Sequence, residues 1–168
     1  FASPFVRAMF HRMMRAFGAP RRRKRALAVC AMWARLRERK PETTTVGVSI
    51  LRRLFARRPA FVQLFTFRSA DPETLFVNAK VKLHGKLLAD ALNAAMEALP
   101  DEAALLGVLG DIGERHGRLY SVKPGHYAAM GEAVGEELRD AAGEEWNDEA
   151  DSAWKATWEL IAETMMAG

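Results

Sequence analysis

Two histidines on successive amphipathic segments constrain this chain more than any other feature. At helical spacing, His84 lies on one apolar stripe and His116 lies on the next. The first stripe consists of Val77, Val81, His84, Leu88, Ala91, Ala95 and Leu99, and the second of Leu105, Leu109, Ile112 and His116. A buried neutral imidazole has one donor and one acceptor nitrogen, and leaving either without a partner costs roughly 1–3 kcal/mol. Each inward histidine therefore needs a partner for both of its nitrogens.

The composition limits the class of protein. Hydrophobic residues make up 49% of the 168 positions, which is enough for the core of one domain. No uninterrupted apolar run approaches the roughly 20 residues of a membrane span, so we expect no transmembrane segment. The single cysteine, Cys30, excludes an internal disulfide and a cysteine-rich metal site, and it fits a reducing compartment. We expect an intracellular protein, in the cytoplasm.

The basic charge is concentrated at the N-terminus. Residues 1–37 contain 10 Lys or Arg and no acid, whereas the remainder contains 15 basic and 21 acidic residues. The net charge of +4 therefore does not indicate a nucleic-acid partner. We interpret residues 1–25 as a basic, arginine-rich extension that serves as an organelle-targeting segment, a membrane-surface helix or a linker. Residues 26–168 form the domain, and because the chain begins without Met we expect it to be a piece of a longer product.

The domain is predicted to be all-α, with about seven helical segments and no competing strand pattern. The expected helices cover residues 26–40, 46–58 with residues 43–45 as caps, a short turn at 59–65, 75–99, 101 to about 117, 124–143, and 147 to about 166. Asp101 is expected to cap the helix that carries His116, and Asn147 or Asp148 to cap the last helix. Pro124 should open the next helix and Gly143 should close it.

Several kinds of site lack their sequence patterns. There is no glycine-rich phosphate loop after a strand, no His-Glu-x-x-His, no paired-cysteine zinc spacing and no Glu-x-x-His pair of a di-iron bundle. The carboxylates between Glu132 and Asp151 are interpreted as solvated helix faces. A flat iron macrocycle suits two inward imidazoles, because one can bind the metal while the other meets its gas ligand. The alternative is that both histidines are satisfied core residues.

Local patterns in a fixed order carry a resemblance to a known family. They are Leu51-Arg-Arg-Leu-Phe55 followed by Pro59, Asn78-Ala-Lys-Val-Lys-Leu-His84-Gly-Lys86, Arg115-His116 followed by Val122-Lys-Pro-Gly-His-Tyr127, and Ala153-Trp154 with Leu160-Ile-Ala162. The chain resembles the globin family, of the full-length kind, over about residues 26–166. The resemblance implies a globin fold, a three-over-three helical sandwich around a haem pocket.

The resemblance also implies roles for particular residues. His116 would be the proximal ligand of the haem iron, and His84 would be the distal histidine. The other implied haem contacts are Phe65 by stacking, Leu51 and Leu88 on the distal side, Ile112 and Val122 on the proximal side, and Arg68, Arg115 and Tyr120 at the propionates. Phe67 either closes the pocket mouth or belongs to the ordinary core, and His126 is expected to be structural. Leu87 departs from the family, since many globins place a polar residue there that reaches a propionate.

The resemblance leaves three functional hypotheses open. The first is reversible binding of oxygen or another diatomic gas, with His84 stabilising the ligand. In the second, His84 is a sixth ligand of the iron, and the protein does redox, nitric oxide or nitrite, or sensing work with a possible reductase partner. The third is a globin-fold interaction module without haem. We assign no catalytic residue and expect no enzyme, except for a secondary nitric oxide dioxygenase or nitrite reductase activity.

Overall fold

The computed structural model describes residues 19–167, which contain six α-helices, three short 3-10 turns and no strand. The elements are α2 (Ala19–Arg39), α3 (Thr43–Arg57), η1 (Pro59–Leu64), η2 (Leu75–Val77), α4 (Ala79–Ala98), α5 (Glu102–Tyr120), α6 (Pro124–Ala142), η3 (Gly143–Glu145) and α7 (Asp148–Ala167). The prediction of an all-α domain is confirmed. The amphipathic start of the predicted basic extension, residues 1–18, lies outside the described residues.

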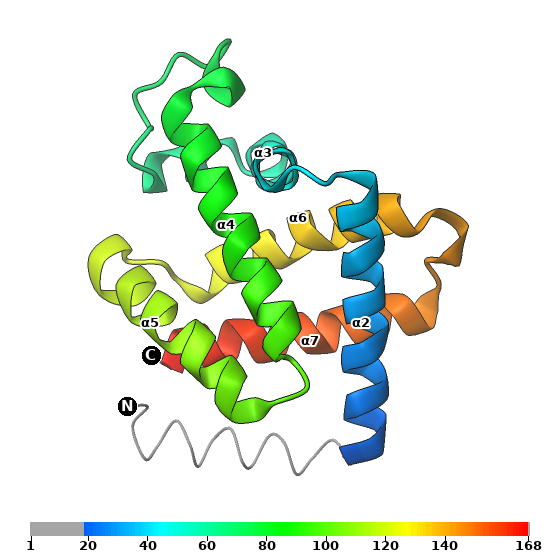
Figure 1. The fold of residues 1–168 in the computed structure, drawn as a ribbon. Helices are drawn as coiled ribbons and strands as arrows, with labels where there is room; N and C mark the ends of the chain where they lie inside the picture. The colour runs from blue at the N-terminus through cyan, green and yellow to red at the C-terminus, as the bar shows by residue number, and fades with distance from the viewer. Residues whose placement is uncertain (1–18, 168) are drawn as a thin grey trace.

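The helices pack in two layers. Figure 1 shows α4 crossing in front of α6 and α7, which run in opposite directions behind it. Helix α2 packs against α6 and α7, α4 packs against α3, and α5 packs against α7. The layer of α2, α4 and α5 thus covers the layer of α3, α6 and α7. The most deeply buried side chains between them include Val29, Leu36, Ile50, Leu105, Val134, Leu138 and Ile161.

The closest helix contact is between α3 and α4, the helix that carries His84. Gly47 on α3 and Gly85 on α4 meet without side chains: a Cβ atom built on Gly47 would lie 1.7 Å from the carbonyl oxygen of Gly85. Only a glycine at position 47 allows the two backbones to approach this closely. The contact therefore places His84, the neighbour of Gly85, close to α3.

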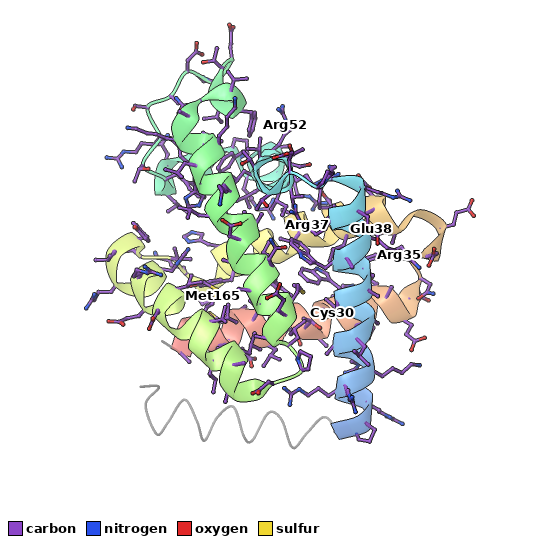
Figure 2. The ribbon with its side chains drawn as sticks, in the orientation of Figure 1. Cys30, Arg35, Arg37, Glu38, Arg52 and Met165 are labelled. Carbon is purple, nitrogen blue, oxygen red and sulfur yellow. The ribbon has the colours of Figure 1, made fainter. Side chains whose placement is uncertain are left out.

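The turn from α2 into α3 is held by one side chain. Arg37, which is labelled near the end of α2 in Figure 2, donates to the carbonyl oxygens of Lys40 and Pro41 and to the hydroxyl of Thr43. The threonines were expected to cap α3, but the helix already begins at Thr43, and the residue before it, Glu42, makes no side-chain cap. The cap prediction was wrong because the Arg37 contacts stabilise this corner in place of an N-cap.

Three other helix boundaries differ from the prediction. Helix α2 begins at Ala19 and not at Ala26, since Pro20 falls in the first turn, where a missing N–H has no consequence. The long helix expected from Leu75 is interrupted, because the side chain of Asn78 accepts from the amide of Lys80 and starts α4 afresh. Val77, expected on the apolar stripe of that helix, is consequently exposed. Helix α5 also passes its predicted stop near Gly117, as described below.

Other predicted signals are confirmed. Asp101 accepts from the amides of Ala103 and Ala104 at the start of α5, and Asn147 accepts from the amide of Ala150 at the start of α7. Helix α6 begins at Pro124 and is followed by Gly143, whose φ of 58° is a conformation that favours glycine. These boundaries depend on local backbone chemistry, which is why they are visible in the sequence.

The interpretation of the carboxylates on α6 as solvated was wrong for Glu137. This side chain is only 1% exposed. It accepts from the Ser49 hydroxyl at 2.8 Å and from Arg53 Nε at 2.6 Å, and it also pairs with Lys40. Burial acts to raise the pKa of Glu137, but the bonds from Lys40, Arg53 and Ser49 outweigh it and hold the pKa below its ordinary value. Glu137 therefore joins α6 to α3 and to the α2–α3 corner as a buried carboxylate.

We expect Glu137→Gln to lower the free energy of unfolding by about 3 kcal/mol at neutral pH, because two cations lose their buried partner. A carboxylate with a lowered folded-state pKa stabilises the fold above its unfolded pKa of about 4.3, and this stabilisation is lost as the pH falls through the lower folded value. The difference between wild type and variant should therefore shrink in acid. Urea unfolding across a pH series measures it.

The matched control is Glu132→Gln on the same helix. Glu132 is half exposed and pairs with Arg57 at 3.3 Å. Its loss should change the free energy of unfolding by less than about 1 kcal/mol. Equal losses at both positions would show that the buried network around Glu137 has no special role.

Candidate functional site

His116 presents one free ring nitrogen. Its Nδ1 lies 2.7 Å from the carbonyl oxygen of Ile112, one turn earlier on α5. A carbonyl oxygen only accepts, so Nδ1 carries the proton and donates, and the lone pair remains on Nε2. A backbone bond of this kind fixes the tautomer and orientation of an imidazole that ligates a metal through its other nitrogen.

The end of α5 holds His116 in place. Helix α5 continues to Tyr120, and Ser121 then adopts the left-handed conformation with a φ of 52°. The amide of Val122 donates to the carbonyl oxygen of His116 at 3.1 Å. Because this corner satisfies a free carbonyl at the helix end, Gly117 does not terminate the helix as predicted. His116 thus lies in a hydrogen-bonded turn with Val122 folded back beside it.

His84 faces the same region from α4. Its ring centroid is 4.9 Å from that of Phe65 and 6.0 Å from that of Phe67, both edge-on. Burial lowers the pKa of His84, and the charge of a protonated His116 lowers it further. A neutral His84 has one N–H to donate and one lone pair to offer.

An aromatic cluster supports the His84 side of the site. Phe65 and Phe67 are stacked with centroids 4.9 Å apart, and Phe55 meets them edge-on at 5.2 Å and 6.1 Å. Arg52, labelled above α3 in Figure 2, lies over the ring of Phe76 at 4.2 Å. Phe67 is 2% exposed and belongs to the core, which favours the core interpretation over closure of a pocket mouth. Phe65 is half-buried between this core and His84.

Four of the remaining predicted haem contacts are apolar side chains. Leu51 on α3 is fully buried, and Leu88, one turn after His84 on α4, is half-buried. Ile112 and Val122 are half-buried beside His116.

The predicted propionate contacts lie at the surface. Tyr120 is exposed, with its ring centroid 5.9 Å from that of His116. Arg115 is exposed on α5, and its Nε donates to the carbonyl oxygen of Asp111. Arg68 is exposed in the segment between η1 and η2.

His126 has a structural position. Its Nδ1 accepts from the amide of Lys123 at 3.0 Å, at the start of α6, and its ring meets Phe61 edge-on at 4.8 Å. Both interactions secure the corner between α5 and α6. This agrees with the prediction that His126 is structural.

Comparison with known proteins decides the family. A globin family model matches residues 48–165, which is most of the chain. The chain belongs to the globin family. The matched region includes α4, α5 and α6 in full, and therefore both inward histidines of this globin.

The individual proteins to which the chain is similar are also named as globins. This globin is 31% identical to cytoglobin-1 of Danio rerio over 102 residues, which are 60% of this chain and 59% of that protein. It is 24% identical to the globin polymeric component P2 of Glycera dibranchiata over 73% of this chain and 80% of that protein. It is 30% identical to the hemoglobin subunit alpha-2 of Varanus albigularis over 61% of this chain and 65% of that protein. The match thus spans less than two thirds of the cytoglobin and of the hemoglobin subunit.

Globins as a family carry haem, and the site in this globin has the chemistry for it. His116 provides a free imidazole nitrogen, and Phe65 and Leu88 provide apolar surface beside a neutral His84. Within residues 19–167, no group of three or more His, Cys, Asp or Glu side chains could hold a metal ion directly. Haem iron needs only one or two protein ligands because the macrocycle supplies the others. The donor set therefore fits haem.

Three residues that position the site were not predicted from the sequence. Gly47 and Gly85 set the approach of α3 and α4, and Asn78 starts α4 shortly before His84. Asn78 could have been found, since an asparagine before a helical segment is a common N-cap. No local signal marks Gly47, because its importance depends on a residue in another helix.

Among the helices of residues 19–167, none combines the length and the apolar character that a membrane span requires.

Proposed function

We propose that this globin binds haem through His116 and reversibly binds oxygen or another diatomic gas. The observation that carries the proposal is the bond from His116 Nδ1 to the carbonyl oxygen of Ile112, which leaves Nε2 free to ligate iron.

Bound haem would supply the iron that takes up the gas. The chain would supply the surroundings: Phe65 would stack on the macrocycle, Leu51 and Leu88 would exclude water on the His84 side, and Ile112 and Val122 would pack on the His116 side. The exposed Arg68 and Tyr120 would be partners of the propionates. An apolar environment of this kind strengthens every hydrogen bond made inside it.

His84 would be the polar group that meets the gas. Its lowered pKa keeps the imidazole neutral, with one N–H available as a donor. A neutral hydrogen bond of this type contributes about 0.5–1.5 kcal/mol. His84 would thus favour retention of a polar ligand such as oxygen.

A second candidate function rests on the same side chain. A neutral His84 also has a lone pair, and the charge of a protonated His116 acts on its pKa. If this lone pair ligated the iron, the protein would have two histidine ligands, and redox, nitric oxide or nitrite, or sensing work with a reductase partner would replace reversible oxygen binding.

An absorption spectrum of the deoxygenated ferrous protein distinguishes the two candidates. One broad visible band indicates an open position, as oxygen binding requires. Sharp, split bands indicate that His84 is bound. A purified, haem-supplied chain without any Soret band would contradict both and would indicate an interaction module.

We expect His84→Leu to weaken oxygen binding by about 2- to 12-fold, which corresponds to the loss of one hydrogen bond of 0.5–1.5 kcal/mol. Stopped-flow oxygen release should be faster by a similar factor, and autoxidation should also be faster. Lys82→Leu is the matched control, because Lys82 is an exposed side chain on the same helix. Unchanged oxygen binding and an unchanged spectrum in His84→Leu would contradict the assigned role.

A further inference from the structure

Exposed apolar side chains gather on the two helices that carry the histidines. Leu83 and Leu87 on α4 are 59% and 57% exposed, and Leu119 on α5 is 59% exposed. Single exposed leucines are ordinary, but a group on one face marks an interaction surface.

Helix geometry places them on the same side of the histidine pair. Successive residues of an α-helix are rotated by about 100 degrees, so Leu83 and Leu87 lie about 60–100 degrees from His84 in one rotational sense. Leu119 is rotated from His116 by a similar angle in the same sense. Figure 1 shows α5 running back against α4. For two facing helices of opposite direction, an equal sense of rotation leads to one common side.

Cations accompany these leucines. Lys80 is exposed one turn before Leu83, and Arg115 is exposed one turn before Leu119. We call these five side chains, Lys80, Leu83, Leu87, Arg115 and Leu119, the leucine face.

On the α4 side of the leucine face, the surrounding charge is also basic. Residues 75–89 contain three Lys and no acid, although residues 38–168 as a whole contain 15 basic and 21 acidic residues. Lys86 and Arg118 flank the leucine face, and each pairs with one acid on its own helix, Asp90 and Glu114. Exposed pairs of this kind are weak and leave the cations available to other anions.

We propose that the leucine face docks this protein on an anionic lipid bilayer, with the leucines among the acyl chains and the cations at the lipid headgroups. Surfaces that lie in a membrane interface combine Lys and Arg with Leu. The cores of protein interfaces are instead depleted of Lys and enriched in aromatic residues. The combination on this face therefore favours a bilayer over an acidic protein. Binding is peripheral and does not depend on haem.

Sedimentation with lipid vesicles tests the proposal on the full chain, with and without haem. The probes are phosphatidylcholine vesicles and the same vesicles with about 30 mol % phosphatidylserine, a lipid that attracts basic surfaces. We expect binding to the anionic vesicles that is at least about tenfold tighter than to the neutral ones and that weakens with salt. Leu83→Ser/Leu87→Ser should weaken this binding by about tenfold, and Lys80→Glu by about fivefold or more.

Leu27→Ser is the matched control, since Leu27 is 54% exposed on α2, which is not a helix of the leucine face. It should bind as the wild type does. Circular dichroism establishes that each variant is folded. If the folded Leu83→Ser/Leu87→Ser variant binds anionic vesicles as tightly as the wild type, the basic N-terminal residues carry the binding and the proposal is wrong. The proposal would also be wrong if the wild type did not bind anionic vesicles. Binding to an acidic polypeptide such as polyglutamate in that case would indicate a protein partner.

Discussion

Replacing His116 by alanine should abolish haem retention while leaving most of the helical structure in place. The imidazole is half-buried, and its Nδ1 bond to the Ile112 carbonyl leaves Nε2 as the nitrogen that would ligate iron. Without the ligand, haem would be held by apolar contacts alone. Removing a partner that merely orients a ligand costs about 10–100-fold in metal affinity, so removing the ligand itself should cost more than about 100-fold. Gel filtration after haem addition, with the ratio of Soret to protein absorbance, measures the loss.

His126→Ala is the control for this prediction. His126 is also half-buried, and it accepts from the Lys123 amide at the start of α6. Its loss should lower stability by about 1 kcal/mol, as the loss of a helix cap does, and should leave haem retention unchanged. Stoichiometric haem in His116→Ala would contradict the ligand assignment, and equal loss in both variants would indicate a general effect of destabilisation.

Replacing Gly47 by alanine should lower the free energy of unfolding by about 3 kcal/mol or more, at the upper end of the range for overpacked cores. The added Cβ would lie 1.7 Å from the oxygen, 2.3 Å from the carbonyl carbon and 2.7 Å from the Cα of Gly85. All three are backbone atoms, so no side chain can move aside and α4 itself must shift. Because His84 is adjacent to Gly85, haem affinity should also fall. Urea unfolding and haem titration measure the two effects.

Gly107→Ala is the matched control for this substitution. Gly107 lies within α5, and a Cβ atom built on it meets nothing within 4 Å. Alanine is favoured over glycine in a helix interior by about 1 kcal/mol, so this variant should be as stable as the wild type or slightly more stable. If Gly47→Ala were equally harmless, the close approach of α3 and α4 would not be needed for the fold.

Much of the fold could be predicted because it depends on local patterns. The apolar stripes predict the helices, Asp101 and Asn147 mark two starts, and Gly143 marks an end. The predictions of the α3 cap and of the end of α5 were wrong because a further contact changed the local preference of the chain. Arg37 secures the α2–α3 corner without a threonine cap, and the bond from Val122 to the His116 carbonyl carries α5 past Gly117. Neither contact can be predicted from helix propensity alone.

The candidate site could be predicted in its main elements. His84 and His116 occur on successive apolar stripes, and both prove to be half-buried and close enough for His116 to affect the pKa of His84. Phe65 and Phe67 were expected near the site, and their rings lie edge-on to His84. Which nitrogen of His116 is free could not be predicted, since it depends on where the carbonyl oxygen of Ile112 lies.

The sequence by itself determined the class of fold, the order of the helices and the pair of histidines, because helical periodicity and motif spacing are properties of one chain segment. Only the tertiary structure decided that Glu137 is a buried partner of Lys40 and Arg53, and that α3 and α4 meet at Gly47. The reason is physical: the local sequence around a carboxylate or a glycine in a helix does not show whether that residue faces water or another helix. Their roles depend on which residues, far apart in the chain, packing brings into contact.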